Sequence, residues 1–511
     1  MAAEGAPEDE GVVFPVHEGR RSTSAVGRAV VADAVRAFDP DLAVHVDAAT
    51  DWRSGYLAPF RHLTLLEGAA PVEIATAGLD AVHDRFVVDV AGRDVPLDLA
   101  MATGLTAERR MPSIHTVVVE GTGPPGVDGA TSDGLSVPYG GGRLRGADLD
   151  RRLDRWLADG TAEPSFAAAV RAVSAHPEWL DARDLTVVVL GAGAEMGPVV
   201  SLLRWGAHVV AVDLPRPALW RRLVEVARSS PGRLSVPVSR WLPAGASDDD
   251  VVEAAGVDLL TQAPAVLGWL LGIEGPFTLG HYVYADGAQH TRSSVAVDAV
   301  MATLAALRDD VSFAFLATPT DAFLVPEDAV LDSQRRYAER TALRRLSRIG
   351  SMGRLFTANY DATVDLPDGR RVGLNDSLVP QQGPNYALAK RIQRWRAVRE
   401  RAGGRLVSLN VAPATRTRSV MRNRALAAAY AGAHRFGVEV FDPSTSNTLM
   451  AALLVHDLRN PDAVANPAVD LDHPLELLWQ GANHGGLWRT AWKPRSVLGV
   501  AVVLGMVQRG A

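Results

Sequence analysis

Two residues at helical spacing, Tyr386 and Lys390, have side chains that suit proton chemistry. Residues 385–396 read Asn-Tyr-Ala-Leu-Ala-Lys-Arg-Ile-Gln-Arg-Trp-Arg, which is typical of a helix, so both side chains are expected on one face. A neighbouring ammonium group favours the tyrosinate and is expected to lower the pKa of the phenol, as a general acid or base requires. The spacing therefore predicts an acid–base pair.

Lysine is rare in this chain, which strengthens that prediction. Of the 52 basic residues, only Lys390 and Lys493 are lysines and the other 50 are arginines. Because arginine supplies positive charge wherever charge alone is needed, a retained lysine indicates chemistry that a planar, permanently protonated guanidinium cannot perform. The alternative is a surface lysine beside a core tyrosine.

A glycine-rich turn after an apolar strand is the second chemical signal. Residues 185–190 form a continuous β-branched run, as expected for a strand buried on both faces. Gly191, Gly193 and Gly197 follow it, and a helix is predicted at 198–205. Glycines let the backbone approach a pyrophosphate, and the start of a helix offers that anion free N–H groups.

An acidic residue stands where a dinucleotide site needs one. A second apolar strand is predicted at 207–213 and ends in Asp213, 22 residues after Gly191. An acid at this distance would accept hydrogen bonds from the adenosine ribose, which favours NAD. Arg216 lies three residues further on and would suit a 2′-phosphate, so NADP stays open. The alternative is a similar scaffold that binds another nucleotide or none.

The chain from about 184 to 458 resembles the short-chain dehydrogenase/reductase family in the order and spacing of its motifs. The tyrosine and lysine described above match the catalytic pair of the family. Residues 257–264 resemble its fourth strand and the turn after it, with both asparagines of the turn replaced. Residues 313–320 resemble the fifth strand, and residues 405–413 resemble the sixth strand and its Asn-x-x-x-Pro-Gly turn. The resemblance implies an α/β fold with a Rossmann-type doubly wound parallel sheet.

The resemblance also implies which residues contact the cofactor, which would be NAD or NADP. The turn matches the family loosely, because Glu195 stands where its middle glycine is usual. Lys390 would hold the nicotinamide ribose. The residues expected at the cofactor are Gly191, Gly193, Glu195, Met196, Gly197, Asp213, Leu214, Thr261, Gln262, Ala263, Lys390 and Pro413.

The residue that replaces the catalytic serine of the family is left open by the sequence. In the family this serine ends the fifth strand, whereas here residues 321–376 look inserted before the tyrosine and include an arginine-rich helix and a hairpin. Thr318 and Thr320 stand at the strand end, and Ser377 stands nine residues before Tyr386. Ligands sit at the carboxyl ends of parallel strands, which favours the strand end. The helix asparagine of the family has no clear match.

Composition excludes several classes of function. The 511-residue chain is 47% hydrophobic and 22% charged, as in a globular protein. It has no cysteine, which excludes disulfides, thiol nucleophiles and thiolate metal sites, and its net charge of −7 argues against general nucleic-acid binding. His281, Asp286 and His290 fit no standard metal spacing, so no metal is expected. These three residues follow the predicted fourth strand and would instead line a substrate pocket.

No signal peptide is expected, because the start of the chain is acidic, and no apolar run reaches the roughly 18 residues of a spanning helix. At the C-terminus, the apolar residues 497–507 follow Trp488, Trp492 and Lys493. A short apolar run flanked by tryptophans and cations suits an interfacial anchor, and the alternative is a buried helix or strand. We expect a cytoplasmic protein, with peripheral membrane association through the C-terminus as an option.

We predict four regions along the chain. Residues 1–145 form an N-terminal α+β region, and the Gly- and Pro-rich stretch 121–147 is its expected linker. Residues 146–182 form a helical connector, residues 183–460 form the Rossmann-like domain with its insertion, and residues 461–511 form a C-terminal extension.

The expected activity is NAD(P)-dependent interconversion of an alcohol and a carbonyl with a Tyr/Lys acid–base pair. The partner is a small-molecule substrate, with lipophilic compounds among the candidates, and a homo-oligomer is expected. Two alternatives remain. The first is an enzyme that uses bound NAD without net oxidation, as some epimerases and dehydratases do, and the second is a non-catalytic nucleotide-binding protein.

Overall fold

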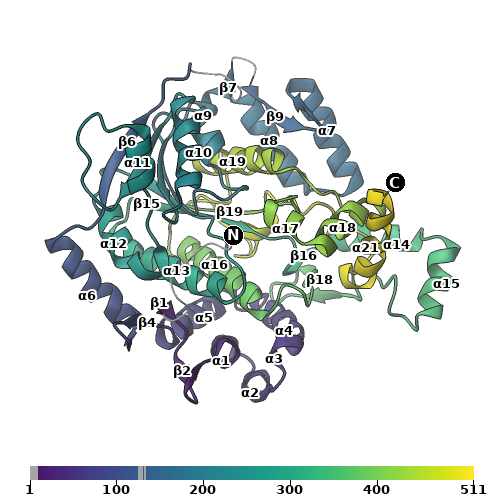
Figure 1. Ribbon diagram of the computed structural model, residues 1–511. Coiled ribbons are helices and arrows are strands. Elements are labelled where there is room, and N and C mark those ends of the chain that lie inside the picture. The colour runs from purple at the N-terminus through teal and green to yellow at the C-terminus, as the bar shows by residue number, and fades with distance from the viewer. Residues whose placement is uncertain (1–9, 125–129, 132–133, 511) are drawn as a thin grey trace.

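The protein is an α/β structure in which helices flank a seven-stranded, mostly parallel sheet (Figure 1). The computed structural model describes residues 10–124, 130–131 and 134–510. The acidic residues 1–9 and parts of the predicted linker, 125–129 and 132–133, lie outside the described residues, as does residue 511. The strands of the central sheet are β6 (His115–Glu120), β11 (Thr186–Leu190), β12 (His208–Val212), β13 (Arg233–Val238), β14 (Phe277–His281), β15 (Val311–Ala317) and β19 (Val407–Val411).

The parallel strands follow a doubly wound order. Across the sheet they run β19-β15-β14-β11-β12-β13, and β6 pairs antiparallel with β13 at the edge. This order is compatible with a Rossmann-like fold, in which two halves diverge from a central point. Here that point lies between β11 and β14. Ligands of such sheets bind beside it, outside the carboxyl ends of the strands.

Most strand predictions are confirmed, but the predicted fourth strand is wrong. The runs predicted at 185–190 and 207–213 are β11 and β12, and the stretches 313–320 and 405–413 contain the end of β15 and the whole of β19. Residues 257–260 instead lead into the helix α12 (Leu259–Leu271), which Asp258 caps by accepting a hydrogen bond from the Leu260 N–H. The fourth parallel strand is β14, further along the chain. A short apolar run fits a buried helix as well as a strand, so periodicity alone could not separate them.

Side chains alternate between the two faces of the sheet, and each face carries its own helices. Val188 and Leu190 of β11 join a hydrophobic cluster with α12, α13 and α16, while Val187 and Val189 join a second cluster with α8, α9, α10 and α19. The bounds of these helices, with those of the neighbouring α11, are as follows: α8 (Pro164–Ala175), α9 (Val199–Arg204), α10 (Pro217–Arg228), α11 (Asp248–Ala254), α13 (Ala288–Leu307), α16 (Pro384–Ala402) and α19 (Pro443–Arg459).

The N-terminal region shares a hydrophobic cluster with the first face. Apolar side chains of α1 and α5 pack with those of α13 and α16, and β6 extends the central sheet. The elements of this region are β1 (Gly11–Val13), β2 (Val16–His17), β3 (Arg20–Arg21), α1 (Thr23–Val35), α2 (Pro40–Ala48), α3 (Trp52–Gly55), α4 (Leu57–Glu67), α5 (Pro71–Arg85), β4 (Val87–Val90), β5 (Arg93–Pro96) and α6 (Leu97–Arg110).

The connector contains the two helices that the sequence predicted. They are α7 (Gly146–Asp159) and α8, and α8 packs on α19 over the second face of the sheet. Gly160, in the left-handed conformation, ends α7. Short pieces around this region are β7 (Ala130–Thr131), β8 (Gly134–Leu135), β9 (Val137–Tyr139), β10 (Gly142–Leu144) and the 3-10 turn η1 (Pro177–Leu180).

The predicted insertion forms a small unit beside the main sheet. Its three strands pair in the order β16-β18-β17, and the predicted hairpin is confirmed as β17 and β18. The arginine-rich part forms two helices. The elements are β16 (Ala322–Pro326), α14 (Glu327–Ala338), α15 (Ala342–Gly350), β17 (Thr363–Asp365) and β18 (Arg371–Asp376).

The C-terminal run is a helix, α21 (Pro494–Gly510), which packs lengthwise on α18 (Arg424–Gly432). One side of α21 is therefore buried, as the helix alternative predicted. None of the helices in the described part of the chain is long and apolar enough to cross a membrane. The remaining elements are α17 (Arg418–Arg422), the 3-10 turn η2 (Ala433–Phe436) and α20 (Glu476–Trp479).

Candidate functional site at the carboxyl ends of the parallel strands

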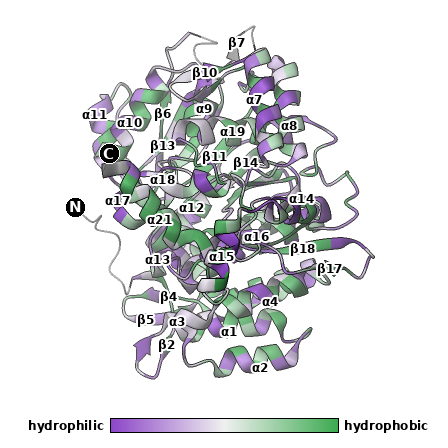
Figure 2. Ribbon diagram, turned by 90° about the vertical axis from the view of Figure 1, so that its right-hand side faces the viewer, coloured by the Kyte–Doolittle hydropathy of each residue, from purple (hydrophilic) through white to green (hydrophobic). Residues whose placement is uncertain are grey.

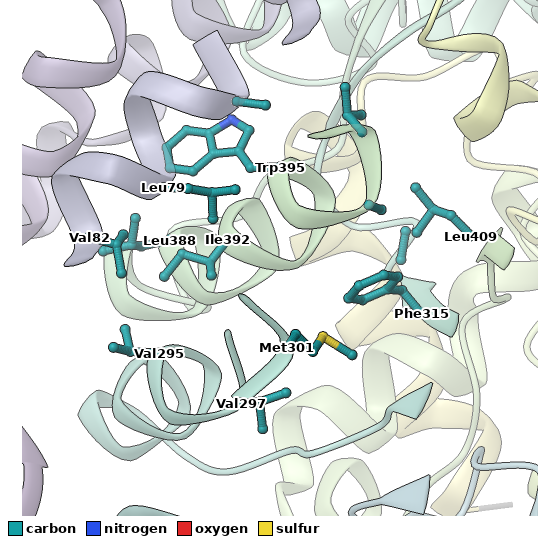
Figure 3. Packing of buried hydrophobic residues seen from close by; sticks show 14 of the residues in the cluster. Leu79, Val82, Val295, Val297, Met301, Phe315, Leu388, Ile392, Trp395 and Leu409 are labelled. Carbon is teal, nitrogen blue, oxygen red and sulfur yellow. The ribbon is translucent and has the colours of Figure 1, made fainter. Parts of the chain in front are cut away.

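The helix that carries the tyrosine–lysine pair, α16, is held between the N-terminal region and the sheet. Figure 3 shows Leu388 and Ile392 of α16 packed among Leu79 of α5, Val295 of α13 and Phe315 of β15. Because this helix is fixed on several sides, its first two turns hold a constant position relative to the end of β15. A rigid position is what a catalytic group needs.

Tyr386 lies half-buried in a cluster of aromatic and hydroxyl side chains. Thr318, the first residue after β15, lies close enough to the phenol to lower its pKa. Its ring centroid is 5.4 Å from that of His290 and 6.5 Å from that of Tyr284. Both of these residues come from the segment that follows β14. The ends of the fourth and fifth parallel strands therefore meet at the phenol.

The expected activation of Tyr386 by Lys390 is not found. Burial raises the pKa of the Tyr386 phenol above its ordinary value, and the nearby Thr318 hydroxyl opposes this only in part. The Lys390 ammonium is directed to other partners. The phenol is therefore protonated at neutral pH in this structure, which suits a proton donor better than a base.

Lys390 joins the end of β15 to the end of β14 through polar contacts. Its Nζ lies 3.4 Å from the Leu316 carbonyl oxygen and donates to Gln393 Oε1 at 3.0 Å. Gln393 Nε2 lies 3.3 Å from His281 Nε2. Burial lowers the pKa of Lys390 to about 8, with the Asp321 carboxylate acting in the opposite direction. Lysine at this position thus titrates near working pH, as arginine could not.

Gln393 is a site residue that the sequence reasoning missed. Its side chain links Lys390 to His281, which is buried and kept neutral, because burial lowers its pKa to about 3. The usable signal was its position three residues after Lys390, on the same face of a predicted helix. In this fold, Gln393 contacts the lysine and His281 contacts Gln393, and the asparagine of the resembling family is lacking.

His290 contains a buried donor without a partner. Its Nδ1 accepts a weak hydrogen bond from the Ala285 N–H at 3.4 Å, which leaves the proton on Nε2. That Nε2 is buried and has no hydrogen-bond partner among the described residues. Burial lowers the pKa of His290 well below its ordinary value, so the ring stays neutral. An unsatisfied donor beside Tyr386 is the kind of group that a ligand oxygen would pair with.

The structure separates the three candidates for the missing serine. Thr318 contacts Tyr386, and its hydroxyl lies 2.9 Å from that of Thr320. Thr320 in turn accepts a hydrogen bond from Gln382 at 2.9 Å. Ser377 is fully buried and donates to Asn375 at 2.8 Å, within the insertion. Of the three hydroxyls, only that of Thr318, at the strand end, influences the pKa of the phenol among the described residues.

The glycine turn follows β11 directly and is closed by Asp213. Gly191 has φ +86°, a conformation that side chains rarely adopt, and an added Cβ would lie 2.7 Å from the Val283 backbone nitrogen. Asp213 accepts hydrogen bonds from the Gly193 N–H at 2.7 Å and from the Leu214 N–H at 2.8 Å. Burial raises the pKa of Asp213, and these two hydrogen bonds oppose the rise.

The rest of the turn has charged neighbours. Glu195 accepts a hydrogen bond from the backbone N–H of Arg418 at 2.7 Å and forms an ion pair with its guanidinium at 3.3 Å. Arg222 donates to the Gly193 carbonyl at 3.2 Å. Met196 is partly buried in the second hydrophobic cluster. Arg222 and Arg418 therefore border the turn on two sides. The negative charge of Glu195, which stands where the resembling family has a glycine, is paired with Arg418.

The remaining predicted cofactor residues occupy two different settings. Pro413 is buried just after β19, at the carboxyl end of a strand, as expected. Thr261, Gln262 and Ala263 lie in the first turns of α12, so the expectation that they end a strand is wrong. Gln262 departs from helical geometry and accepts a hydrogen bond from the Asp258 N–H. The end of the fourth parallel strand, where Thr261, Gln262 and Ala263 were expected, is occupied by His281 and, shortly after it, Tyr284.

Helices after β19 cover the tyrosine. Ser419 of α17 lies close enough to Tyr284, and Tyr430 of α18 close enough to Tyr386, to influence the pKa of each phenol. Two surface depressions, of about 530 and 470 Å³, lie elsewhere, between α10 and α11 and beside α8, α14 and α20. Within the described residues, no group of three or more His, Cys, Asp or Glu side chains is placed to hold a metal ion.

Comparison of the chain with protein-family models, curated proteins and solved structures yields no match.

Proposed function

We propose that the protein is an NAD(P)-dependent oxidoreductase of the short-chain dehydrogenase/reductase type, which reduces a carbonyl or oxidises the corresponding alcohol. The observation that carries the proposal is that Tyr386, Lys390 and Thr318 meet at the carboxyl end of β15, while the glycine turn and Asp213 lie at the ends of β11 and β12. These strand ends share one edge of the sheet.

The residues at the glycine turn fit a dinucleotide. Each Asp213 oxygen accepts one backbone N–H and keeps a lone pair that would accept a ribose hydroxyl. Arg222 and Arg418 border the turn, where a pyrophosphate would need positive charge. A bound nicotinamide cofactor would supply or accept the hydride. NADP remains an alternative to NAD, because Arg216 follows Asp213 closely.

The chain's own residues support proton donation to a substrate oxygen. Because the Tyr386 phenol is protonated at neutral pH, it would act as general acid in the direction of carbonyl reduction. Thr318 would hold the same substrate oxygen by a second hydrogen bond. The His290 Nε2–H would offer a third donor from the end of β14. Lys390 and Gln393 would position the cofactor ribose and link it to His281.

The test is consumption of NADH or NADPH with a panel of aldehydes and ketones. We expect Tyr386→Phe to lower kcat about 10²- to 10⁴-fold while leaving cofactor binding intact, because only the proton donor is lost. Lys390→Arg is expected to impair activity as well, since its guanidinium does not titrate near pH 8. Tyr139→Phe makes the same chemical change at a distant hydrogen bond to Glu439 and is the matched control.

The same experiment distinguishes the alternatives. Full activity in both Tyr386→Phe and Lys390→Arg would refute the assignment of the pair. Binding of NAD without turnover of any carbonyl or alcohol would favour an enzyme that uses the cofactor without net oxidation. Absence of a thermal shift with all four cofactor forms would leave a non-catalytic scaffold.

A further inference from the structure

An arginine-rich helix with an exposed apolar stripe projects from the insertion. On α15, Leu343, Leu346 and Ile349 recur every third residue and are 73%, 65% and 74% exposed. Met352, just beyond the helix, is 80% exposed. No residue of α15 is buried. A helix in a globular protein normally turns its apolar stripe to the core, so these side chains lack the partner that such a stripe requires.

The C-terminal helix adds a second apolar strip nearby. Gly505 of α21 packs so tightly on α18 that an added Cβ would lie 1.9 Å from the Ala428 carbonyl oxygen. The opposite side of α21 is open to solvent and carries four exposed large apolar side chains. They are Val503, Leu504, Met506 and Val507.

The two helices belong to one face of the molecule. A small hydrophobic cluster contains Phe356, shortly after α15, together with Val497 and Ala501 of α21. Arg344 of α15 lies 5.2 Å over the ring of Trp492, and it also donates to the Arg435 carbonyl beside α18. Figure 2 looks onto this face, with α15 and α21 both toward the viewer. We call the exposed apolar side chains of α15, Met352 and α21 the apolar face.

Three stretches of sequence that contain or flank the apolar face lack acidic residues. Residues 340–360 include five arginines and no Asp or Glu, and residues 412–438 include another five arginines and no Asp or Glu. Residues 477–511, which end in α21, also contain no Asp or Glu. The whole chain has 59 acidic residues and a net charge of −7, so these stretches are locally cationic. Carboxylates from other parts of the chain pair with two of their cations, since Asp442 pairs with Arg416 and Glu195 with Arg418. Among the described residues, no carboxylate pairs with Arg344, Arg345 or Arg348.

We propose that this face docks the protein on an anionic lipid bilayer. Arginines would contact the headgroups, and the aliphatic side chains of the apolar face would enter the boundary with the acyl chains, as in interfacial amphipathic helices. A nucleic acid would leave the aliphatic side chains without a partner. A second copy of the chain, meeting this face with its own, would bring arginines of like charge together. The proposal does not depend on the oxidoreductase assignment.

The test is flotation of the full chain with vesicles of phosphatidylcholine alone and of phosphatidylcholine with phosphatidylglycerol. We expect binding to the anionic vesicles, weakened by salt, and little binding to the neutral ones. The double variant Leu346→Glu with Ile349→Glu is expected to lower binding about tenfold or more, because two inserted side chains become charged. Both positions are exposed, so the variant folds without repacking a core.

Leu99→Glu is the matched control, because Leu99 is exposed on α6, on the opposite side of the molecule (Figure 1). This variant is expected to bind like the parent chain, and so is Tyr386→Phe. Equal binding to both vesicle types, unchanged binding by the α15 double variant, or no binding at all would overturn the proposal. Loss of a dimer in that variant, without vesicle binding by the parent chain, would assign the face to a second copy instead.

Discussion

The arginine-rich helices α15 and α16 have similar compositions and opposite environments. The arginines of α15 donate to backbone carbonyls and to a tyrosine hydroxyl, and one of them lies over an aromatic ring. The leucines of α15 are exposed to solvent. In α16, Arg391 is fully buried against Glu67 of α4, Arg394 pairs with Asp321 at 3.0 Å, and Arg396 pairs with Asp298 at 2.8 Å. Arginine content alone therefore does not indicate whether a helix lies on the surface.

The difference lies in what the neighbouring elements supply. Around α16, carboxylates from α4, α13 and the start of the insertion neutralise the buried Arg391, Arg394 and Arg396, so that burial of the helix is tolerated. Around α15, no carboxylate of the described residues pairs with Arg344, Arg345 or Arg348. Paired charges fix α16 under the site, whereas unpaired charges leave α15 available to an external anionic partner. Three measurements test this comparison.

The largest effect is expected from Asp298→Ala, which leaves the Arg396 guanidinium buried without its bidentate partner. Removing one member of such a pair is expected to lower the free energy of unfolding by about 3–5 kcal/mol, measured by urea denaturation. Replacing both partners by apolar residues, Asp298→Leu with Arg396→Met, should restore most of the loss. A change below about 1 kcal/mol in the single variant would contradict the role of paired charge in α16.

The second effect is a pH dependence carried by His83, which contacts Asp298 at 2.9 Å and Asp98 at 2.6 Å. Burial alone would lower its pKa, but the hydrogen bonds and charges of the two aspartates outweigh burial and raise it to about 9. Protonated His83 thus stabilises the fold fully below its unfolded pKa of about 6.5, and this contribution is lost as pH rises through about 9.

The stability difference between the parent chain and His83→Gln is accordingly expected to shrink, by on the order of 2–3 kcal/mol, between about pH 6 and about pH 9.5. Free energies of unfolding at both pH values measure it. The same difference at both pH values would show that His83 stays neutral.

The smallest effect on stability is expected from Arg345→Gln on α15, where the guanidinium is exposed and contacts the Ala338 carbonyl alone. The free energy of unfolding should change by less than about 0.5 kcal/mol. Binding to anionic vesicles should fall about fivefold, as expected for one cation removed from a lipid contact. A stability loss as large as that of Asp298→Ala would mean that α15 is a structural helix like α16.

Much of the central fold could be predicted from the sequence because its signals are local. The β-branched runs of β11 and β12, the glycine turn between them and the i, i+4 spacing of Tyr386 and Lys390 depend only on neighbouring residues. The fourth strand could not be located in this way, because the apolar run at 257–260 fits a buried helix equally well. The twenty-residue helix α13 also had no clear periodicity, since it is buried nearly all round.

The candidate site shows the same division. Local sequence indicated the tyrosine, the lysine, the glycines and Asp213 as chemically suited residues. It favoured Thr318 over Ser377 only through the general position of ligands in parallel sheets, because the insertion made distance along the chain uninformative. It also predicted a lowered pKa for Tyr386, whereas burial raises that pKa and the Lys390 ammonium donates to Gln393 instead of the phenol.

The sequence by itself determined which residue types were present and how they were spaced within single elements. The tertiary structure alone decided which strand ends meet, which arginines are buried beside carboxylates and which apolar side chains stay exposed. The physical reason is that burial, pairing and desolvation depend on atoms that are distant in the chain. Glu67 and Arg391 are separated by 324 residues, yet their contact helps to fix the helix that carries Tyr386.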